Sequence, residues 1–310
     1  MTNRQEKIRR NLLDLRGSIP AAVRLQIFRR QCKRDAELSA KVSRQLGLKN
    51  LDCSATPEGA EGNTLFILAG GRTINDLSES DFATIRSNTS VGINFWPIHD
   101  FVPNILTSES DASEVANPFL DERLRRKEMV DQPPIVLSLR TNWPIPLNSL
   151  QVFPEELEKR RFVYGRANLV TKRTENLARD LSLTLRALMK GKIPPSVLPD
   201  NGSTVVRMSF WGALKGFSKI VWVGVDQDSG PYFWTDRPNS NHYRRAAEAV
   251  PRETGKPHST SSSANRPFSN DVFLPALAKA LWETTNTEVY VGSKKSLLSQ
   301  NVPVYDWLAN

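Results

Sequence analysis

Histidine is the side chain best suited to moving protons near neutral pH, and the chain contains His99, His242 and His258. His258 lies in the polar stretch PHSTSSSANRPFSND, which offers no apolar face against which an imidazole could be buried. This setting is compatible with a mobile lid that presents a histidine base, and equally with a linker that carries an incidental histidine. His99, within NFWPIHDF, is typical of a structural histidine.

The histidines and cysteines do not have the spacing of a metal site. The sequence has no HExxH or HxH motif, and no cluster of cysteine with histidine. We therefore expect no metal and no other cofactor. Cys32 and Cys53 do not form a CxxC motif, and two cysteines in 310 residues favour a reducing compartment over a disulfide framework.

Two short apolar runs end in residues that could contact a nucleotide. The run at 64–69 ends in Gly70 and Gly71, where missing side chains would let a phosphate or ribose approach the backbone and the following amides donate to it. A plain tight turn is the alternative interpretation. Asn94 lies at the end of the next predicted strand, 90–95, where its amide could contact a base edge or a hydroxyl.

A third polar strand end follows KIVWVGVD at 219–226, the most hydrophobic predicted strand of the chain. It ends in Asp226 and leads into QDSGPYFW, a loop that contains Asp228 and Tyr232. Such a loop fits a catalytic or ligand-binding segment, or a surface turn held by aromatic packing. In open parallel sheets ligands bind beyond the carboxyl ends of the strands, which would bring these three ends together.

The elements that would position these residues alternate between strand and helix. Helices are predicted over 78–86, 174–190, 205–217 and 270–282, with further strands at 135–139 and 288–292. This alternation predicts an α/β fold with a mostly parallel sheet flanked by helices. Residues 64–310 are expected to form one such domain, with a lid around 228–270.

The net charge of +9 is concentrated at one end of the chain. Residues 1–50 contain 13 Lys and Arg against 4 Asp and Glu, while the remaining 260 residues are neutral overall. We expect a basic helical extension over 1–50 and a linker at 51–63. Such an arm does not amount to a basic binding face, so no nucleic-acid partner is expected.

Residues 21–46 are predicted to form an amphipathic helix, with an apolar side that includes Val23, Ile27, Phe28 and Leu38. Contact with an anionic membrane surface and docking onto the protein body are both left open. No stretch approaches the roughly 18 apolar residues that a membrane span needs, and no secretion signal is evident. A cytoplasmic protein is expected, with peripheral contact at the inner face of the membrane as an open option.

The order of several motifs resembles the bacterial lipooligosaccharide and capsule sialyltransferases, glycosyltransferase family 42. The segments LFILAGGRTI and SVGINFW look like the family's opening strands, with its glycine turn and its strand-ending asparagine. GSTVVRM, GFSKIVWVGVD, SGPYFW and PHS follow in the family's order. The resemblance covers 64–110 and 200–300, and it implies a Rossmann-like fold that is a variant of the GT-A type.

The resemblance also implies roles for individual residues. The CMP part of the donor would be held by Gly70, Gly71, Asn94, Ser203 and Thr204. The remaining two residues would carry the chemistry: Tyr232 as a hydrogen-bond donor to the leaving phosphate and His258 as the base for the acceptor hydroxyl. An inverting, metal-independent transferase would result, moving a sialic-acid-like (nonulosonic or ulosonic) sugar to a glycan or glycolipid at the bacterial surface.

Three departures from the family leave the sugar open. The earlier of the family's two loop tyrosines is replaced, with Asp228 nearby; Gly71 replaces its asparagine, and Asn201 replaces its arginine. A Kdo-type or other nucleotide-dependent transferase on the same scaffold is one alternative. An adaptor for membrane or nucleic acid, built around the basic arm, is another. The acceptor, the linkage and any homo-oligomer are not determined by the sequence.

Overall fold

The computed structural model describes most of the chain, and the statements below concern these residues. They are residues 19–51, 63–109, 118–126, 135–139, 161–171, 173–236, 240–250 and 268–308.

One parallel sheet forms the centre of the molecule. Its strands are β1 (Lys49–Asn50), β2 (Thr64–Leu68), β3 (Thr89–Ile93), β4 (Ile105–Glu109), β5 (Ile135–Leu139), β6 (Arg161–Asn168), β7 (Val197–Asp200), β8 (Lys219–Val223) and β9 (Glu288–Val291). Their order is β1-β6-β5-β4-β3-β2-β8-β9, with β7 also paired to β6. Because the chain builds outward from β2 to β6 and then returns to β8, the strand order reverses at β2. Ligands of open α/β sheets bind at such a switch point.

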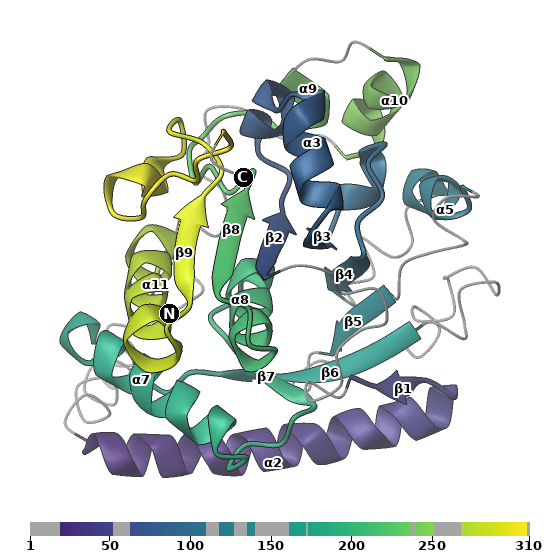
Figure 1. The fold of residues 1–310 in the computed structure, drawn as a ribbon. Helices are drawn as coiled ribbons and strands as arrows, with labels where there is room; N and C mark the ends of the chain where they lie inside the picture. Colours follow the sequence, from purple (N-terminus) through teal and green to yellow (C-terminus); the bar gives the residue numbers. More distant parts are fainter. Residues whose placement is uncertain are drawn as a thin grey trace, which may run out of the picture.

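Helices cover both faces of the sheet (Figure 1). They are α2 (Ala21–Leu46), α3 (Glu79–Arg86), α5 (Pro118–Leu124), α7 (Thr174–Met189), α8 (Thr204–Leu214), α9 (Phe233–Asp236), α10 (Asn241–Ala249) and α11 (Asn270–Thr285), with short 3-10 turns η1 (Arg72–Asp76), η2 (Trp96–Ile98) and η5 (Leu297–Gln300). Figure 1 shows β8 and β9 running across the direction of β6, which reflects the twist of the sheet.

Two hydrophobic cores lie on opposite faces of the sheet, because successive side chains of a strand point to opposite sides. In β2, Leu65 and Ile67 join the core beneath α7, α8 and α11. Phe66 and Leu68 join the second core, which includes residues of α3, α9 and α10. All four side chains are fully buried, so β2 is the central strand of a three-layer α/β/α domain.

The α/β fold with a parallel sheet is confirmed, and the helices predicted at 174–190, 205–217 and 270–282 correspond to α7, α8 and α11. The strand predicted over 90–95 begins one residue earlier and ends at Ile93. Asn94 then adopts a left-handed backbone with φ of 53°, which takes it out of the strand.

The segment expected to form a lid around 228–270 is in part regular structure. It contains α9 and α10, both packed on the body of the protein, while 251–267 lies outside the described residues. The predicted division into 1–50, 51–63 and 64–310 stays a prediction. Within residues 1–50, α2 packs along β6, and β1 pairs with β6 as a parallel strand (Figure 1).

Helix α2 is rotated relative to the apolar side that the sequence predicted. Phe28 is buried, as expected, but Val23, Ile27 and Leu38 are 42%, 40% and 38% exposed. The buried face is partly polar, and its Arg24 forms a buried ion pair with Asp180 of α7 at 2.7 Å. This ion pair and the small residues along the same face seat the helix in an orientation that leaves part of its apolar surface outside.

Candidate active site at the carboxyl edge of the sheet

The turn after β2 and the loop after β8 are joined through their backbones. Gly71 forms an isolated antiparallel bridge with Tyr232. The amide of Phe233 donates to the carbonyl of Gly70 at 3.0 Å, and the amide of Gly71 donates to the carbonyl of Gly224 at 2.9 Å. Two of the predicted site groups, the glycine pair and the tyrosine loop, are thereby brought together.

The glycines are required by this close approach of two backbone segments. A Cβ on Gly71 would lie 2.4 Å from the carbonyl oxygen of Gly224 and 2.4 Å from a carboxylate oxygen of Asp226. A Cβ on Gly70 would lie 3.2 Å from the ring of Trp234. We expected the missing side chains to make room for a ligand. The structure corrects this expectation, because the protein's own loop fills that space.

The backbone amides after the glycines are also engaged within the protein. The amide of Thr73 donates to Asp226 at 3.1 Å, its hydroxyl donates to the other carboxylate oxygen at 2.5 Å, and the amide of Ile74 donates to the carbonyl of Gly71 at 3.2 Å. Asp226 is buried, and its burial raises the pKa of the carboxyl group above the ordinary value. The amides of Gly71, Thr73 and Ile74 already have acceptors, so donation to a phosphate is not supported for these three amides.

A charged pair lies directly beside the turn. Arg72, the residue after the glycines, pairs with Asp228 at 3.0 Å, and the two side chains are 45% and 18% exposed. The amide of Gly230 donates to the same carboxylate at 3.0 Å. A carboxylate near a leaving phosphate would repel it unless its charge is balanced. Arg72, which the analysis did not select, balances that negative charge.

Asn94 and Thr204, two of the predicted donor-binding residues, are in direct contact. The Thr204 hydroxyl donates to Oδ1 of Asn94 at 3.3 Å. The amide of Asn94 donates to the carbonyl of Thr107 at 2.7 Å, which holds its left-handed backbone in place. Asparagine tolerates this conformation better than most residues, and such backbones often occur at functional sites.

A buried arginine fixes the orientation of this pair. Nη2 of Arg207 donates to the Thr204 hydroxyl oxygen at 2.6 Å. Because a guanidinium can only donate, the Thr204 oxygen must accept from it, and the threonine proton is free to go to Oδ1 of Asn94. The side-chain nitrogen of Asn94 is then the group that can face a ligand, and it can only donate. The expected ligand atom at Asn94 is therefore an acceptor.

Arg207 belongs to a buried charged cluster that the sequence analysis missed. Its Nη1 donates to Asp200 at 2.7 Å, its Nε donates to the Tyr164 hydroxyl at 2.9 Å, and Arg166 lies 3.8 Å from the other oxygen of Asp200. Arg207 is fully buried, and burial raises the pKa of Tyr164. A lone arginine within the apolar helix VVRMSF was the signal that could have identified this cluster.

Ser203 precedes α8, as predicted, but its side chain does not cap the helix. The amides of Gly202 and Ser203 donate instead to Asp200, at 2.9 and 3.1 Å, so the aspartate organises this turn. The Ser203 hydroxyl accepts from the side-chain amide of Asn270 at 3.3 Å. Ser203 and Asn270 are both buried, so α8 and α11 meet at this point.

Tyr232 stacks on Trp234, with ring centroids 4.4 Å apart. Trp234 in turn contacts Phe95, the residue after Asn94, with ring centroids 6.0 Å apart. The tyrosine loop and the Asn94 pair are thus neighbours along one edge of the sheet. His258 lies outside the described residues, so its proposed role as a base stays a prediction.

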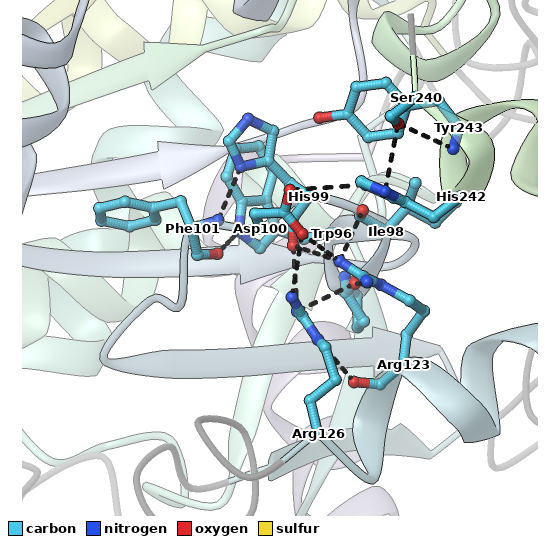
Figure 2. A network of polar contacts seen from close by, with 11 residues as sticks. Trp96, Ile98, His99, Asp100, Phe101, Arg123, Arg126, Ser240, His242 and Tyr243 are labelled. Carbon is cyan, nitrogen blue, oxygen red and sulfur yellow. Dashed lines mark hydrogen bonds and ion pairs between the residues drawn. The ribbon is translucent and has the colours of Figure 1, made fainter. Parts of the chain in front are cut away.

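A second polar network joins η2, α5 and α10 (Figure 2). Asp100 accepts from Arg123 at 2.6 Å and from Arg126 at 3.3 Å, and it lies 3.6 Å from His242. Partial burial acts to raise the pKa of Asp100, but the Arg123 hydrogen bond and the nearby positive charges hold it below its ordinary value. The sequence analysis did not predict this network.

His99 is a structural residue, as its sequence context predicted. Its ring stacks on Trp96 with centroids 4.8 Å apart, and Nδ1 accepts from the amide of Phe101 at 2.9 Å. Burial lowers the pKa of His99 to about 4, so the ring is neutral at physiological pH.

In the described part of the chain, no three side chains of His, Cys, Asp or Glu gather as metal ligands would. None of the helices in that part combines the length and apolar character needed to span a membrane.

No protein-family model matches the sequence, and no curated protein matches it. Two solved structures from Campylobacter jejuni are similar to the chain. The monofunctional α-2,3-sialyltransferase Cst-I has 14% sequence identity and a TM-score of 0.48, over 82% of this chain and 84% of its own. An α-2,3-sialyltransferase in its apo form has 13% identity and a TM-score of 0.44, over 85% and 86%. Both are sialyltransferases, the class of enzyme that the motif order resembles.

Proposed function

We propose that this chain is an inverting, metal-independent glycosyltransferase that moves a sialic-acid-like sugar from a CMP donor to a saccharide acceptor of a surface glycan. One observation carries the proposal. Residues selected from the motif order, which include Gly71, Asn94, Thr204 and Tyr232, come from four separate segments and lie along one edge of the sheet, where the strand order reverses. A nucleotide is the common ligand of such an edge.

The environment of Asn94 supports a nucleotide as the ligand. Its side-chain nitrogen is the group left to donate, and it suits a carbonyl oxygen of cytosine or a ribose oxygen. A CMP donor has a single phosphate in its leaving group, so it needs less positive charge than a sugar diphosphate, for which a divalent cation is often recruited. A metal-independent transferase is consistent with this chemistry.

The proposed reaction is a single displacement. His258 takes the proton of the acceptor hydroxyl, and the acceptor oxygen forms a bond to the anomeric carbon of the donor sugar. The bond from that carbon to the phosphate oxygen breaks at the same time, and CMP leaves with the electron pair. The Tyr232 hydroxyl donates a hydrogen bond to the departing phosphate. Attack from the face opposite the leaving group inverts the anomeric carbon.

Isothermal titration of the protein with CMP, in the presence of EDTA and with CDP, UDP and GDP as controls, tests this proposal. We expect selective binding of CMP without metal. Selective binding would justify a screen of nonulosonic and ulosonic donors, including a Kdo-type donor. No binding, or a preference for a diphosphate with magnesium, would contradict the proposal and favour a phosphotransferase.

We further propose that the enzyme works at the inner face of the membrane, in contact with it through α2. The outward side of this helix has residues spaced by three and four, which places them in one stripe. This outward stripe consists of Val23, Ile27, Arg30, Arg34, Leu38 and Lys41. All six side chains are exposed. Cations interleaved with exposed apolar side chains suit an anionic bilayer, since the charges attract lipid headgroups and the apolar groups enter the interface.

Sedimentation with vesicles tests the membrane contact. We expect the protein to sediment with phosphatidylglycerol-containing vesicles and to remain in solution with purely phosphatidylcholine vesicles. Lys41→Glu should weaken the binding, whereas Lys279→Glu, at an exposed lysine of α11, changes the net charge equally and should weaken it less. An equal effect of the two variants would show that overall charge, and not the outward stripe, attracts the lipid.

A further inference from the structure

Three backbone amides of the glycine turn are already engaged within the protein. The amides of Gly71, Thr73 and Ile74 donate to Gly224, Asp226 and Gly71. An amide that already has an acceptor gives little to a ligand unless the first bond breaks. A nearby side chain with unused donor capacity is therefore the better partner.

Arg72 has the position and the chemistry for this role. It follows the two glycines directly, and Gly71 is bridged to Tyr232, the residue proposed to contact the leaving phosphate. The Arg72 side chain is 45% exposed, so a ligand can reach its guanidinium group. A planar guanidinium with five donors matches the geometry of phosphate oxygens better than an ammonium group does.

The loop after β8 makes room for this guanidinium. A Cβ on Gly230 would lie 3.1 Å from Nε of Arg72 and 3.0 Å from the carboxylate oxygens of Asp228. A side chain at position 230 would therefore crowd the charged pair. The pair holds Arg72 beside the turn. A phosphate that binds Arg72 must therefore displace the carboxylate of Asp228.

We propose that Arg72 is the cation that binds the donor phosphate, and that on binding it exchanges Asp228 for the phosphate. This inference rests on the proposed CMP donor and adds the residue that neutralises the leaving group. The earlier of the two tyrosines in the resembling family's phosphate loop is replaced in this chain, and Arg72 would supply the hydrogen-bond donor in its place. Asp228 opposes phosphate binding in this arrangement, because its negative charge competes for the same guanidinium.

Titration calorimetry with CMP and with cytidine separates a contact to the phosphate from a contact to the nucleoside. We expect Arg72→Gln to lower the affinity for CMP by about tenfold or more, the range of a hydrogen bond to a charged group, and to leave cytidine binding unchanged. Arg72→Lys should recover part of the CMP affinity, since it restores the charge without the fork. Thermal unfolding of each variant checks that the fold is intact.

Asp228→Asn is the matched control, because it breaks the same ion pair from the other side. If Arg72 contacts the phosphate, this variant keeps or gains CMP affinity. If the ion pair only holds the loop in place, Asp228→Asn loses as much affinity as Arg72→Gln, and the inference is wrong. It is also wrong if Arg72→Gln binds CMP as tightly as the wild type. Failure of the wild type itself to bind CMP would instead overturn the proposed function.

Discussion

Two aspartates in this molecule each lie between two arginines, and their surroundings differ. Asp200 lies between Arg207 and Arg166, with a side chain that is 3% exposed. Asp100 lies between Arg123 and Arg126 with a side chain that is 65% exposed (Figure 2). The same residue types therefore serve different purposes. The buried cluster orients the pair formed by Asn94 and Thr204, and the exposed network connects α5 to η2.

The largest expected effect is on the buried aspartate. Asp200→Asn removes the negative charge but leaves the two buried guanidiniums, so we expect the free energy of unfolding to fall by about 3–5 kcal/mol. Asp100→Asn is the matched control. The exposed carboxylate is hydrated and screened, so its loss should cost about 1 kcal/mol or less. Urea denaturation measures both, and equal losses would refute the distinction between the networks.

The second prediction concerns His258, which belongs to neither network. Loss of a general base lowers turnover by about 10²- to 10⁴-fold, so we expect His258→Ala to lose activity to that extent. Binding of CMP and the free energy of unfolding should stay close to wild type, unlike the result for Asp200→Asn. Initial rates with a CMP-activated donor measure the effect. Unchanged turnover would remove His258 from the mechanism.

The pH dependence of stability provides a further test near the exposed network, because His99 lies next to Asp100. Burial lowers the pKa of His99 to about 4 in the folded protein, against about 6.5 in the unfolded chain. The unfolded state therefore binds a proton that the folded state excludes. Stability should be unaffected above pH 6.5 and fall by roughly 3 kcal/mol between pH 6.5 and 4.

His99→Gln removes the titrating group and should flatten this part of the profile. Unfolding by urea at several pH values, compared between His99→Gln and the wild type, separates His99 from the carboxylates that titrate in the same range. Parallel profiles for the two proteins would show that His99 does not have a lowered pKa.

The smallest effect is expected for the contact between the buried cluster and Asn94. Thr204→Val removes the hydroxyl that links Arg207 to Asn94, and we expect a loss of stability of about 1 kcal/mol and an approximately tenfold weaker affinity for CMP. Thr285→Val removes a hydroxyl that donates to a carbonyl within α11. This control should lose similar stability and no affinity. If both variants bind CMP as the wild type does, Thr204 does not orient the site.

Much of the fold was predictable because periodicity and turn residues identify long or strongly apolar elements. The strands β2, β8 and β9 and the helices α7 and α11 fall in this class. The strands β6 and β7 were not found, for physical reasons. β6 has charged residues and Gly165 within RFVYGRAN, and β7 is a strand of four residues that contains Pro199, a residue type depleted in strands.

The site was only partly predictable. Glycines, asparagine and threonine at strand ends are visible in the sequence, and Asn94 and Thr204 prove to be in contact. The partners that orient them are not visible, because Tyr164 and Arg207 meet only once β6 and α8 have packed. The charge balance of Asp228 depended likewise on Arg72, which precedes it by more than 150 residues in the chain.

The place of β2 in the sheet also affects how the protein is made. One neighbour, β3, follows it closely, but Thr64 pairs on the other side with Lys219, late in the chain. During synthesis, the second edge of β2 is covered only after most of the polypeptide has emerged. Its apolar side chains stay exposed until then. We expect nascent chains that stop before residue 219 to aggregate or to require a chaperone, and the carboxyl edge of the sheet to be the last part of the molecule to assemble.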